Sequence, residues 1–304
     1  MPLERGSARM GGDVMIPDST QEVRPKVLVA LDGSPAAAAA VPIARVLAVQ
    51  LGAELAVLHV VERESTESEE EVQRRLALDT AAPPKPCLYV RRGDPATEIL
   101  RAAVEPDVVL VVLTTHGRLI EMGRGLGRTA EAVVAGTDRP VLLVRPEAAR
   151  AREAAPFTRL LIPLDGTPGT AAALPPVLTL AERLHTAIDL LFVVDPSQRP
   201  PEEPGSMRVP RYLDQPQHEW PHWAEEFMSR LACTCAGRTP AVPMTVVITY
   251  GDVGQEVARV ATERRSSAIV VVRRSRLQTG RALRLRAILQ NAPCPVIVTG
   301  RAED

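Results

Sequence analysis

The sequence predicts an α/β protein of two similar domains, each a doubly wound parallel sheet. The first basis is an internal repeat, because Lys26–Pro35 (KVLVALDGSP) returns as Arg159–Pro168 (RLLIPLDGTP). The match runs without a gap to Glu62 and Asp195, so its offset is constant (165 − 32 = 133 and 195 − 62 = 133). This length exceeds the period of solenoid proteins, so each copy is expected to be a whole domain. The second basis is the alternation of apolar runs with helical segments, which is typical of parallel sheets buried on both faces.

The apolar runs of the first copy predict five strands separated by helices. The expected strands are Lys26–Leu31, Glu54–Val60, Cys87–Arg92, Asp107–Leu113 and Pro140–Val144. The expected helices cover Pro35–Leu51, Glu67–Thr80, Pro95–Val104 and Thr129–Ala135.

The second copy predicts the same strands with one long insertion. The strands are Arg159–Leu164, Ala187–Val194, Met244–Tyr250, Ser267–Val272 and Pro295–Thr299. Gly93 matches Gly251 at an offset of 158, so 158 − 133 = 25 residues have entered before that point. Residues 196–221, rich in proline and charge, are expected to form a surface excursion packed by Trp220 and Trp223.

The chain is expected to have four parts. Residues 1–23 form a flexible tail, 24–147 the first domain, 148–156 a linker and 157–301 the second domain. At 304 residues the chain is long enough for two domain cores. Because only 3% of the residues are aromatic, these cores must be mainly aliphatic.

Composition argues against several functional classes. The net charge of −1 and the few aromatic residues give no reason to expect a nucleic-acid partner. No segment is apolar and long enough to span a membrane, and no signal-peptide core is present, so we expect a cytoplasmic protein with no membrane partner. The four cysteines suggest no disulfide framework, and Cys87 and Cys294 are expected to be small buried hydrophobic side chains.

Histidines and cysteines near the insertion superficially suggest zinc. His218 and His222 are spaced for one helical face, and Cys233 and Cys235 follow them. The cysteines lack the usual two-residue spacer, and Pro221 disturbs the helix that would align the histidines, so we expect no zinc. A structural role is the first expectation for the other histidines, which are His59, His116 and His185.

The turn after the first strand is the first candidate site. Ser34 and Thr167 suit helix N-caps and Pro35 and Pro168 suit the first helical position, so capping explains these residues in both copies. Asp32 has two interpretations. A carboxylate at the carboxyl end of this strand lies where open α/β sheets bind ligands, and it equally suits stabilisation of the turn.

The second candidate is the glycine-rich loop from Thr114 to Thr129. Glycines let backbone amides approach a phosphate, and the helix beyond them adds a favourable dipole. Arg118, Arg124 and Arg128 offer guanidinium groups that pair with phosphates. A mobile surface loop with solvated arginines is the alternative. The loop and the Asp32 turn flank one crevice of the predicted sheet, which favours a nucleotide.

Both halves resemble the universal stress protein family, and the chain looks like a tandem member. The resemblance rests on VALDGS at Val29–Ser34, LHVV at Leu58–Val61, GDPATEI at Gly93–Ile99, Thr115–Gly117 with its loop, and DRPVLLVR at Asp138–Arg145. It implies five-stranded sheets of order 3-2-1-4-5 in the nucleotide-binding α-hydrolase-like fold. It also implies that the copies pair through their last strands, residues 140–144 and 295–299, because unpaired edge strands favour a partner.

ATP-binding members of this family carry Gly, two residues, Gly, nine residues, and Gly followed by Ser or Thr. Gly117 and Gly127 keep the nine-residue spacing, whereas Thr114 replaces the first Gly and Arg128 replaces the Ser or Thr. Arg128 either supplies a charge-assisted phosphate contact or blocks the site. The nucleotide contacts that the resemblance implies are Ala30, Leu31, Asp32, Val60, Thr114, His116, Gly117, Gly127, Arg128 and Thr129.

The second half keeps Asp165 but departs from this motif. Arg273–Arg276 (RRSR) stands where glycines are expected, and Gly280 is alone in a shorter segment. Counting thirteen residues back from Pro140 gives Gly127, whereas the same count from Pro295 gives Ala282. The second half is therefore expected to have lost its phosphate loop.

The resemblance implies a stress-response regulatory protein that binds ATP or AMP in its first domain, with Mg²⁺ accompanying ATP and the second domain as a degenerate partner. At most weak ATP hydrolysis is expected, because no general base or metal-binding carboxylate pair stands beside the loop. Two alternatives stay open: a scaffold of the same family that binds no nucleotide, and an ATP-using enzyme on a related fold. A homodimer is a further expectation.

Overall fold

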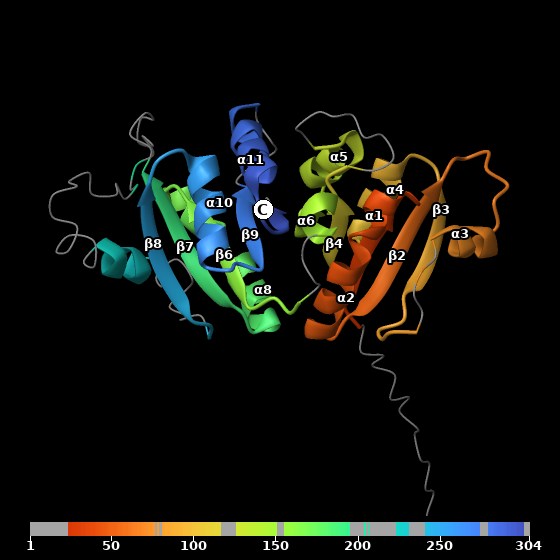
Figure 1. The fold of residues 1–304 in the computed structure, drawn as a ribbon, viewed down its shortest axis with the longest axis horizontal. Coiled ribbons are helices and arrows are strands. Elements are labelled where there is room, and N and C mark those ends of the chain that lie inside the picture. The colour runs from red at the N-terminus through yellow and green to blue at the C-terminus, as the bar shows by residue number, and fades with distance from the viewer. Residues whose placement is uncertain are drawn as a thin grey trace, which may run out of the picture.

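Two α/β halves share one continuous sheet (Figure 1). The computed structural model describes residues 24–76, 78, 81–116, 126–150, 155–194, 204, 206, 223–230, 241–273 and 279–300. The half that begins with β1 lies on the right in Figure 1, and the later half lies on the left.

The first half follows the predicted order of strands and helices. Its strands are β1 (Lys26–Leu31), β2 (Glu54–Val61), β3 (Cys87–Arg92), β4 (Val108–Thr114) and β5 (Val141–Val144). Its helices are α1 (Pro35–Ala38), α2 (Val41–Gln50), α3 (Glu69–Leu76), α4 (Pro95–Ala103) and α5 (Arg128–Gly136), and α6 (Pro146–Arg150) follows β5. The strand bounds agree with the prediction to within one residue at each end.

The second half repeats this order. Its strands are β6 (Arg159–Leu164), β7 (Ala187–Val194), β8 (Met244–Tyr250), β9 (Ala268–Arg273) and β10 (Val296–Gly300). Its helices are α7 (Pro168–Ala172), α8 (Pro175–Leu184), α10 (Val253–Glu263) and α11 (Thr279–Asn291), with a further helical stretch over residues 223–230. Trp223 in that stretch is buried and packs edge-to-face on Phe192 of β7, with ring centroids 4.6 Å apart. Trp220 lies outside the described residues.

The sheet topology confirms the predicted strand order. The sheet runs β3-β2-β1-β4-β5-β10-β9-β6-β7-β8, so each half has the order 3-2-1-4-5. Strands within each half are parallel. β5 and β10 pair antiparallel, with Leu143 opposite Val296. The expected pairing of the last strands is therefore present, and it covers two edges that separate domains would leave open.

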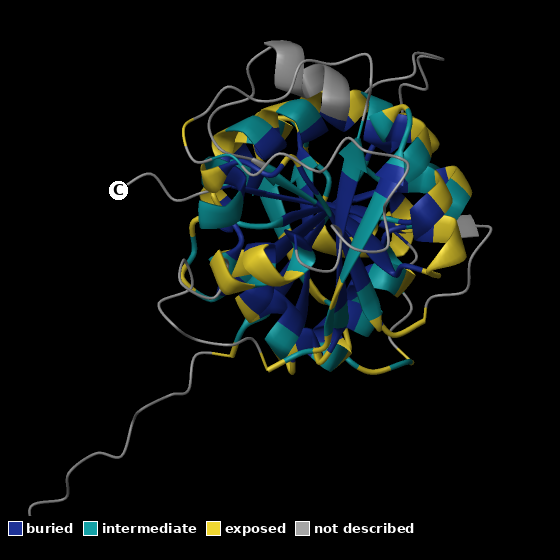
Figure 2. Ribbon diagram, turned by 90° about the vertical axis from the view of Figure 1, so that its left-hand side faces the viewer, coloured by how far each residue is buried: buried dark blue, intermediate teal, exposed yellow. Residues whose placement is uncertain are grey.

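Aliphatic side chains form one core layer on each face of the sheet. One layer packs under α2, α3 and α8, and we call this side the α2 face. The other packs under α4, α5, α10 and α11, and we call this side the α5 face. Each layer contains residues of both halves, so the halves share their cores. Figure 2 shows the strands as a buried central layer surrounded by helices.

Proline interrupts the first long helix of each half. The single helix predicted over Pro35–Leu51 is wrong, because α1 ends at Ala38 and α2 begins at Val41. Pro42 lacks the amide hydrogen that would bond to the Ala38 carbonyl oxygen, so the helix restarts. Prolines at the start of α8 separate it from α7 in the same way.

The prediction that Cys87 is buried is also wrong. Cys87 is exposed, because β3 is the outermost strand of its half and half of its side chains face solvent. Cys294 is buried, as expected.

Hydrogen bonds outside the sheet also join the two halves. Gln50 Nε2 donates to the Phe157 carbonyl oxygen at 3.1 Å, and the Phe157 amide donates to Gln50 Oε1 at 2.7 Å. Arg145 Nη1 donates to the carbonyl oxygens of Gln290 and Ala292 at 2.9 and 3.2 Å. A cation at this place is favourable because it meets the C-terminal end of α11.

Candidate functional site

Asp32 lies in the turn between β1 and α1, at the carboxyl edge of the sheet. Gly33 has a φ of +82°, a left-handed conformation that favours glycine, and the Ser34 amide donates to Asp32 Oδ1 at 2.9 Å. Ser34 Oγ accepts from the Ala37 amide at 3.1 Å and caps α1. Asp32 therefore stabilises its turn, and its position at this edge also suits contact with a ligand.

Gly127 brings the start of α5 against the end of β4. Its amide donates to the Thr115 carbonyl oxygen at 2.8 Å, and a Cβ at this position would meet that oxygen at 3.2 Å. The first turn of α5 has no side-chain cap, and Arg128 and Thr129 are exposed. Amides at a helix N-terminus attract anions, so this approach creates a place suited to phosphate at the same edge as Asp32.

The end of β4 carries Thr114 and His116 to this edge. Thr114 pairs in register with Val144, and the Thr115 amide donates to the Val144 carbonyl oxygen at 2.9 Å. Thr115 is buried, and its Oγ1 lies 3.0 Å from His116 Nδ1. His116 therefore has a structural partner while staying half-buried at the rim.

Ala30 and Val60 give the edge an apolar side. Both are half-buried and pack, like Leu126, against the core of the α5 face. Leu31 differs, because its side chain is buried on the α2 face and its carbonyl oxygen lies 2.6 Å from His59 Nδ1. The structure thus places Ala30 and Val60 on one side of the sheet and turns the Leu31 side chain to the other.

Part of the predicted loop lies outside the described residues. Gly117, Arg118 and Arg124 fall within residues 117–125. The other predicted contact residues lie at the carboxyl ends of β1, β2 and β4 or at the start of α5.

A polar network next to Asp32 was not predicted. Arg75 on α3 donates from Nε and Nη2 to the two carboxylate oxygens of Glu67, at 2.8 and 2.9 Å. Its Nη2 also lies 2.9 Å from His59 Nε2. The hydrogen bond to Glu67 raises the pKa of Arg75, and the charge of Asp32 adds a smaller effect of the same sign. Contacts between a strand and a distant helix leave no local sequence pattern, so no signal pointed to Arg75.

The second copy ties its aspartate into its own turn. Asp165 Oδ1 accepts from the hydroxyls of Thr167 and Thr170, each at 2.6 Å, and from the Thr167 amide at 3.2 Å. Ala37 is the counterpart of Thr170 (170 − 133 = 37) and has no hydroxyl. The two aspartates therefore have the same position but different surroundings.

The last helix of the second copy also begins earlier than its counterpart. With Pro295 aligned on Pro140 (295 − 140 = 155), Arg128 at the start of α5 matches Leu283 (128 + 155 = 283). α11 begins at Thr279, four positions before that point (283 − 279 = 4), which is about one helical turn. Ala282, the counterpart of Gly127, is thus inside a helix rather than before one.

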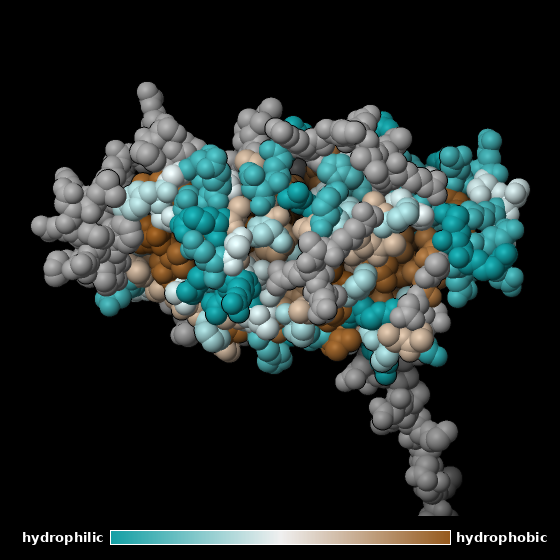
Figure 3. All heavy atoms as spheres, in the orientation of Figure 1, coloured by the Kyte–Doolittle hydropathy of each residue, from teal (hydrophilic) through white to brown (hydrophobic). Residues whose placement is uncertain are grey.

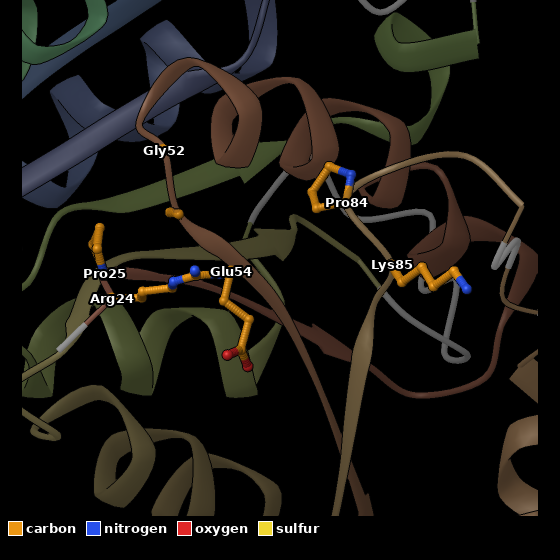
Figure 4. A pocket seen from close by; sticks show the side chains of 7 residues that line it. Arg24, Pro25, Gly52, Glu54, Pro84 and Lys85 are labelled. Atoms are coloured by element: carbon orange, nitrogen blue, oxygen red, sulfur yellow. The ribbon is translucent and has the colours of Figure 1, made fainter. Parts of the chain in front are cut away.

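A cavity of about 730 Å³ lies at the opposite edge of the sheet (Figure 4). Its lining residues precede or begin strands of the first half: Arg24, Pro25, Gly52, Ala53, Glu54, Pro84 and Lys85. Parallel strands run from this edge towards the Asp32 edge, so the cavity is separate from the candidate site.

Within the described residues, no group of three or more His, Cys, Asp or Glu side chains is arranged to hold a metal ion. His218, His222, Cys233 and Cys235 lie outside that part of the chain, so the absence of zinc stays a prediction. None of the described helices is long and apolar enough to cross a membrane.

The universal stress protein family model matches both halves of the chain, at residues 24–145 and 156–300. The chain belongs to the universal stress protein family. The paired matches confirm the tandem organisation that the internal repeat predicts.

Solved universal stress proteins have the same fold. One from Archaeoglobus fulgidus DSM 4304 is 15% identical with a TM-score of 0.59, and the alignment covers 91% of this chain and 98% of that chain. A putative universal stress protein from Pseudomonas aeruginosa UCBPP-PA14 is 13% identical with a TM-score of 0.59, covering 91% and 93%. No curated protein sequence matches the chain. At these identities the likeness shows the fold of this universal stress protein and leaves its ligand to be argued from the site.

Proposed function

We propose that this universal stress protein binds ATP or AMP in its first half and acts as a stress-response regulator. The observation that carries the proposal is the close approach of Gly127 to Thr115, which opens the uncapped start of α5 at the same edge as Asp32. A nucleotide needs both features, because its phosphates require donors and its nucleoside requires a carboxylate and an apolar wall.

The nucleoside end of the ligand is assigned to the first two strands. The Asp32 carboxylate would accept a hydrogen bond from a ribose hydroxyl or from the adenine amino group. Ala30 and Val60, half-buried on the α5 face, would border the base. Leu31 would contribute through its backbone, since its side chain is buried on the other face.

The phosphate end is assigned to the start of α5 and the loop before it. The amides at Arg128 and Thr129 would donate to phosphate oxygens, while Gly127, whose own amide bonds to Thr115, holds the helix start in place and Gly117 would allow the loop to approach. Arg128 is exposed, so its guanidinium would reach a phosphate without a buried partner having to be displaced. Thr114 and His116 would flank the phosphates from the end of β4.

Mg²⁺ would enter with ATP and be held mainly by phosphate oxygens, as this ion commonly is. The described residues offer no metal-binding carboxylate cluster that would hold it independently. Regulation by binding, with at most weak ATP hydrolysis, is part of the proposal.

The second half is proposed to be a structural partner. Asp165 is engaged by two threonine hydroxyls, and Ala282 lies inside α11 where Gly127 precedes α5. Its clearest contribution is β10, which pairs with β5 and completes the shared sheet.

A scaffold that binds no nucleotide is the second candidate function. The observation that favours it is Arg128, which stands where ATP-binding relatives have Ser or Thr. In that case Arg128 would prevent binding, and its replacement by Ser would be needed to create a nucleotide site.

Calorimetric titration with ATP and with AMP tests the proposal. Asp32→Asn removes the charge but keeps an oxygen for the Ser34 amide, and Asp165→Asn is the matched control in the second copy. Saturable binding to the wild type should weaken about 10- to 100-fold in Asp32→Asn and stay unchanged in Asp165→Asn. Absence of saturable binding to the wild type would refute the proposal and favour the scaffold.

A further inference from the structure

His59 lies on β2 directly behind the candidate site. Its side chain is 3% exposed and bonds to α3 across the α2 face, whereas its neighbour Val60 packs on the α5 face. The backbone of His59 pairs with Leu31, the residue before Asp32. His59 thus contacts the strand end that carries the Asp32 turn.

Both ring nitrogens of His59 have fixed roles. A carbonyl oxygen can only accept, so Nδ1 must carry the hydrogen that bonds to Leu31 at 2.6 Å. A guanidinium can only donate, so Nε2 must accept from Arg75 at 2.9 Å. The network therefore requires the neutral ring, because a protonated ring would direct an N–H group and a positive charge at Arg75.

α3 depends on tertiary contacts for its position. It has eight residues, a length at which an isolated helix is marginal in water. Val72 and Leu76 are its buried residues, and the α3 end of the molecule, on the right in Figure 3, is hydrophilic. The bonds from Arg75 to Glu67 and His59 therefore connect a weakly buried helix to β2.

We propose that Arg75 is a positioning residue of the nucleotide site and that it keeps α3 attached to β2 only while His59 is neutral. The proposal rests on the proposed function. Arg75 fixes α3 and Glu67 against the end of β2 and places a positive charge near Asp32, so that the carboxylate and the β2 end keep the arrangement that a nucleoside would meet.

Acid weakens this arrangement. The network is complete while His59 is neutral and is lost once the ring takes up a proton. Among the described residues, Arg75 on α3 contacts the ring, and Arg75 in turn interacts with Glu67 before that helix and with the charge of Asp32 after β1. Arg92 at the end of β3 donates to the Ser65 and Glu67 carbonyl oxygens and holds the same segment. Nucleotide affinity is thus predicted to be lower in acid.

The first test measures ATP and AMP affinity at about pH 7.5 and about pH 5.5 in four proteins. They are the wild type, Arg75→Met, His59→Gln and the control His185→Asn, which removes an exposed histidine after α8. Glutamine has a donor and an acceptor and does not titrate, so His59→Gln should bind like the wild type at the higher pH.

In acid, the wild type and His185→Asn should lose about threefold to tenfold more affinity than His59→Gln. At the higher pH, Arg75→Met should bind nucleotide about threefold to tenfold more weakly than the wild type. Between the two pH values, its loss of affinity should be no larger than that of His59→Gln. Titration of the nucleotide's own phosphate affects every protein equally and cancels in this comparison. Equal acid losses in the wild type and His59→Gln would overturn the proposal.

The second test needs no nucleotide. Hydrogen exchange of the α3 amides is compared between the wild type and His59→Gln at the same acidic pH, so that the intrinsic exchange rates cancel. We expect exchange to be about threefold to tenfold faster in the wild type. Equal rates would overturn the proposal even if nucleotide binds. If no nucleotide binds at either pH, the proposed function fails, while the exchange rates still decide whether Arg75 holds α3 through neutral His59.

Discussion

Leu142 on β5 lies directly opposite Ile297 on β10, and neither residue is exposed to solvent. Both belong to the core of the α2 face, which continues from one half to the other. Strands that would be open edges in separate domains are therefore the buried centre of one sheet. The two halves are accordingly expected to unfold as one cooperative unit.

Truncation of this pair tests that cooperativity. Leu142→Ala and Ile297→Ala should each lower the free energy of unfolding by about 2–5 kcal/mol, since each leaves a cavity in the shared core. Because the side chains are neighbours, the double variant should depart from additivity by about 0.5–3 kcal/mol. Urea unfolding followed by circular dichroism should show a single transition, and two separate transitions would contradict a shared core.

Gly127→Ala should weaken nucleotide binding about tenfold. Its Cβ would meet the Thr115 carbonyl oxygen at 3.2 Å, so the start of α5 would have to move away from β4. A displaced helix start no longer presents its amides to phosphate, and loss of one such hydrogen bond costs about 1.5 kcal/mol. Calorimetry with ATP measures the change.

Gly136→Ala, at the other end of α5, is the matched control. Its Cβ would meet the Leu100 side chain at 2.9 Å, so it disturbs packing without touching the start of the helix. Both variants should lose stability, and affinity should fall in Gly127→Ala alone. An equal loss of affinity in both variants would contradict the prediction, because the effect would then come from disturbing α5 as a whole.

Asp189 on β7 is predicted to contribute strongly to the stability of the whole protein. It is fully buried, and Arg264 donates to its two oxygens at 3.0 and 2.9 Å while Arg159 lies 3.0 Å from Oδ1. Asp189→Asn leaves two guanidinium groups without their counter-charge and should cost about 3 kcal/mol. The exposed pair Glu131–Arg286 is the control, since Glu131→Gln should cost under about 1 kcal/mol. Similar costs in urea unfolding would contradict the prediction.

Glu256 should make stability depend on pH in the acid range. Hydrogen bonds from Arg259 and then from the Thr249 hydroxyl hold its pKa below the ordinary value of 4.5. Its pKa is lower in the folded than in the unfolded state, so its contribution is complete above pH 4.5 and is lost as the pH falls below that value. In Glu256→Gln, the free energy of unfolding should therefore fall less steeply than in the wild type as the pH is lowered below 4.5. An equally steep fall in both proteins would count against this assignment.

Local patterns predicted the strands well, whereas their order in the sheet came from the family resemblance. Runs such as Val108–Leu113 are apolar throughout because both faces of the sheet are covered, and the repeat at offset 133 supplied the second set. The Asp32 turn and the Gly127 spacing were also visible, since capping and close backbone approach require particular residue types at fixed positions.

Features that depend on distant contacts were not predictable. Cys87 is exposed because β3 has no neighbour beyond it, which only the assembled sheet reveals. The bond between His59 and Arg75 depends on how α3 packs on β2. The start of α11 at Thr279, four positions before the counterpart of the α5 start, was likewise not predicted.

The stoichiometry of nucleotide binding tests most directly the claim that one copy of the repeat is a site and the other is a structural partner. Titration of the full chain with ATP, repeated with AMP, measures the number of nucleotides bound at saturation. We predict one nucleotide per chain. Two per chain would contradict the loss of the second site, and none would contradict the site at Asp32 and Gly127.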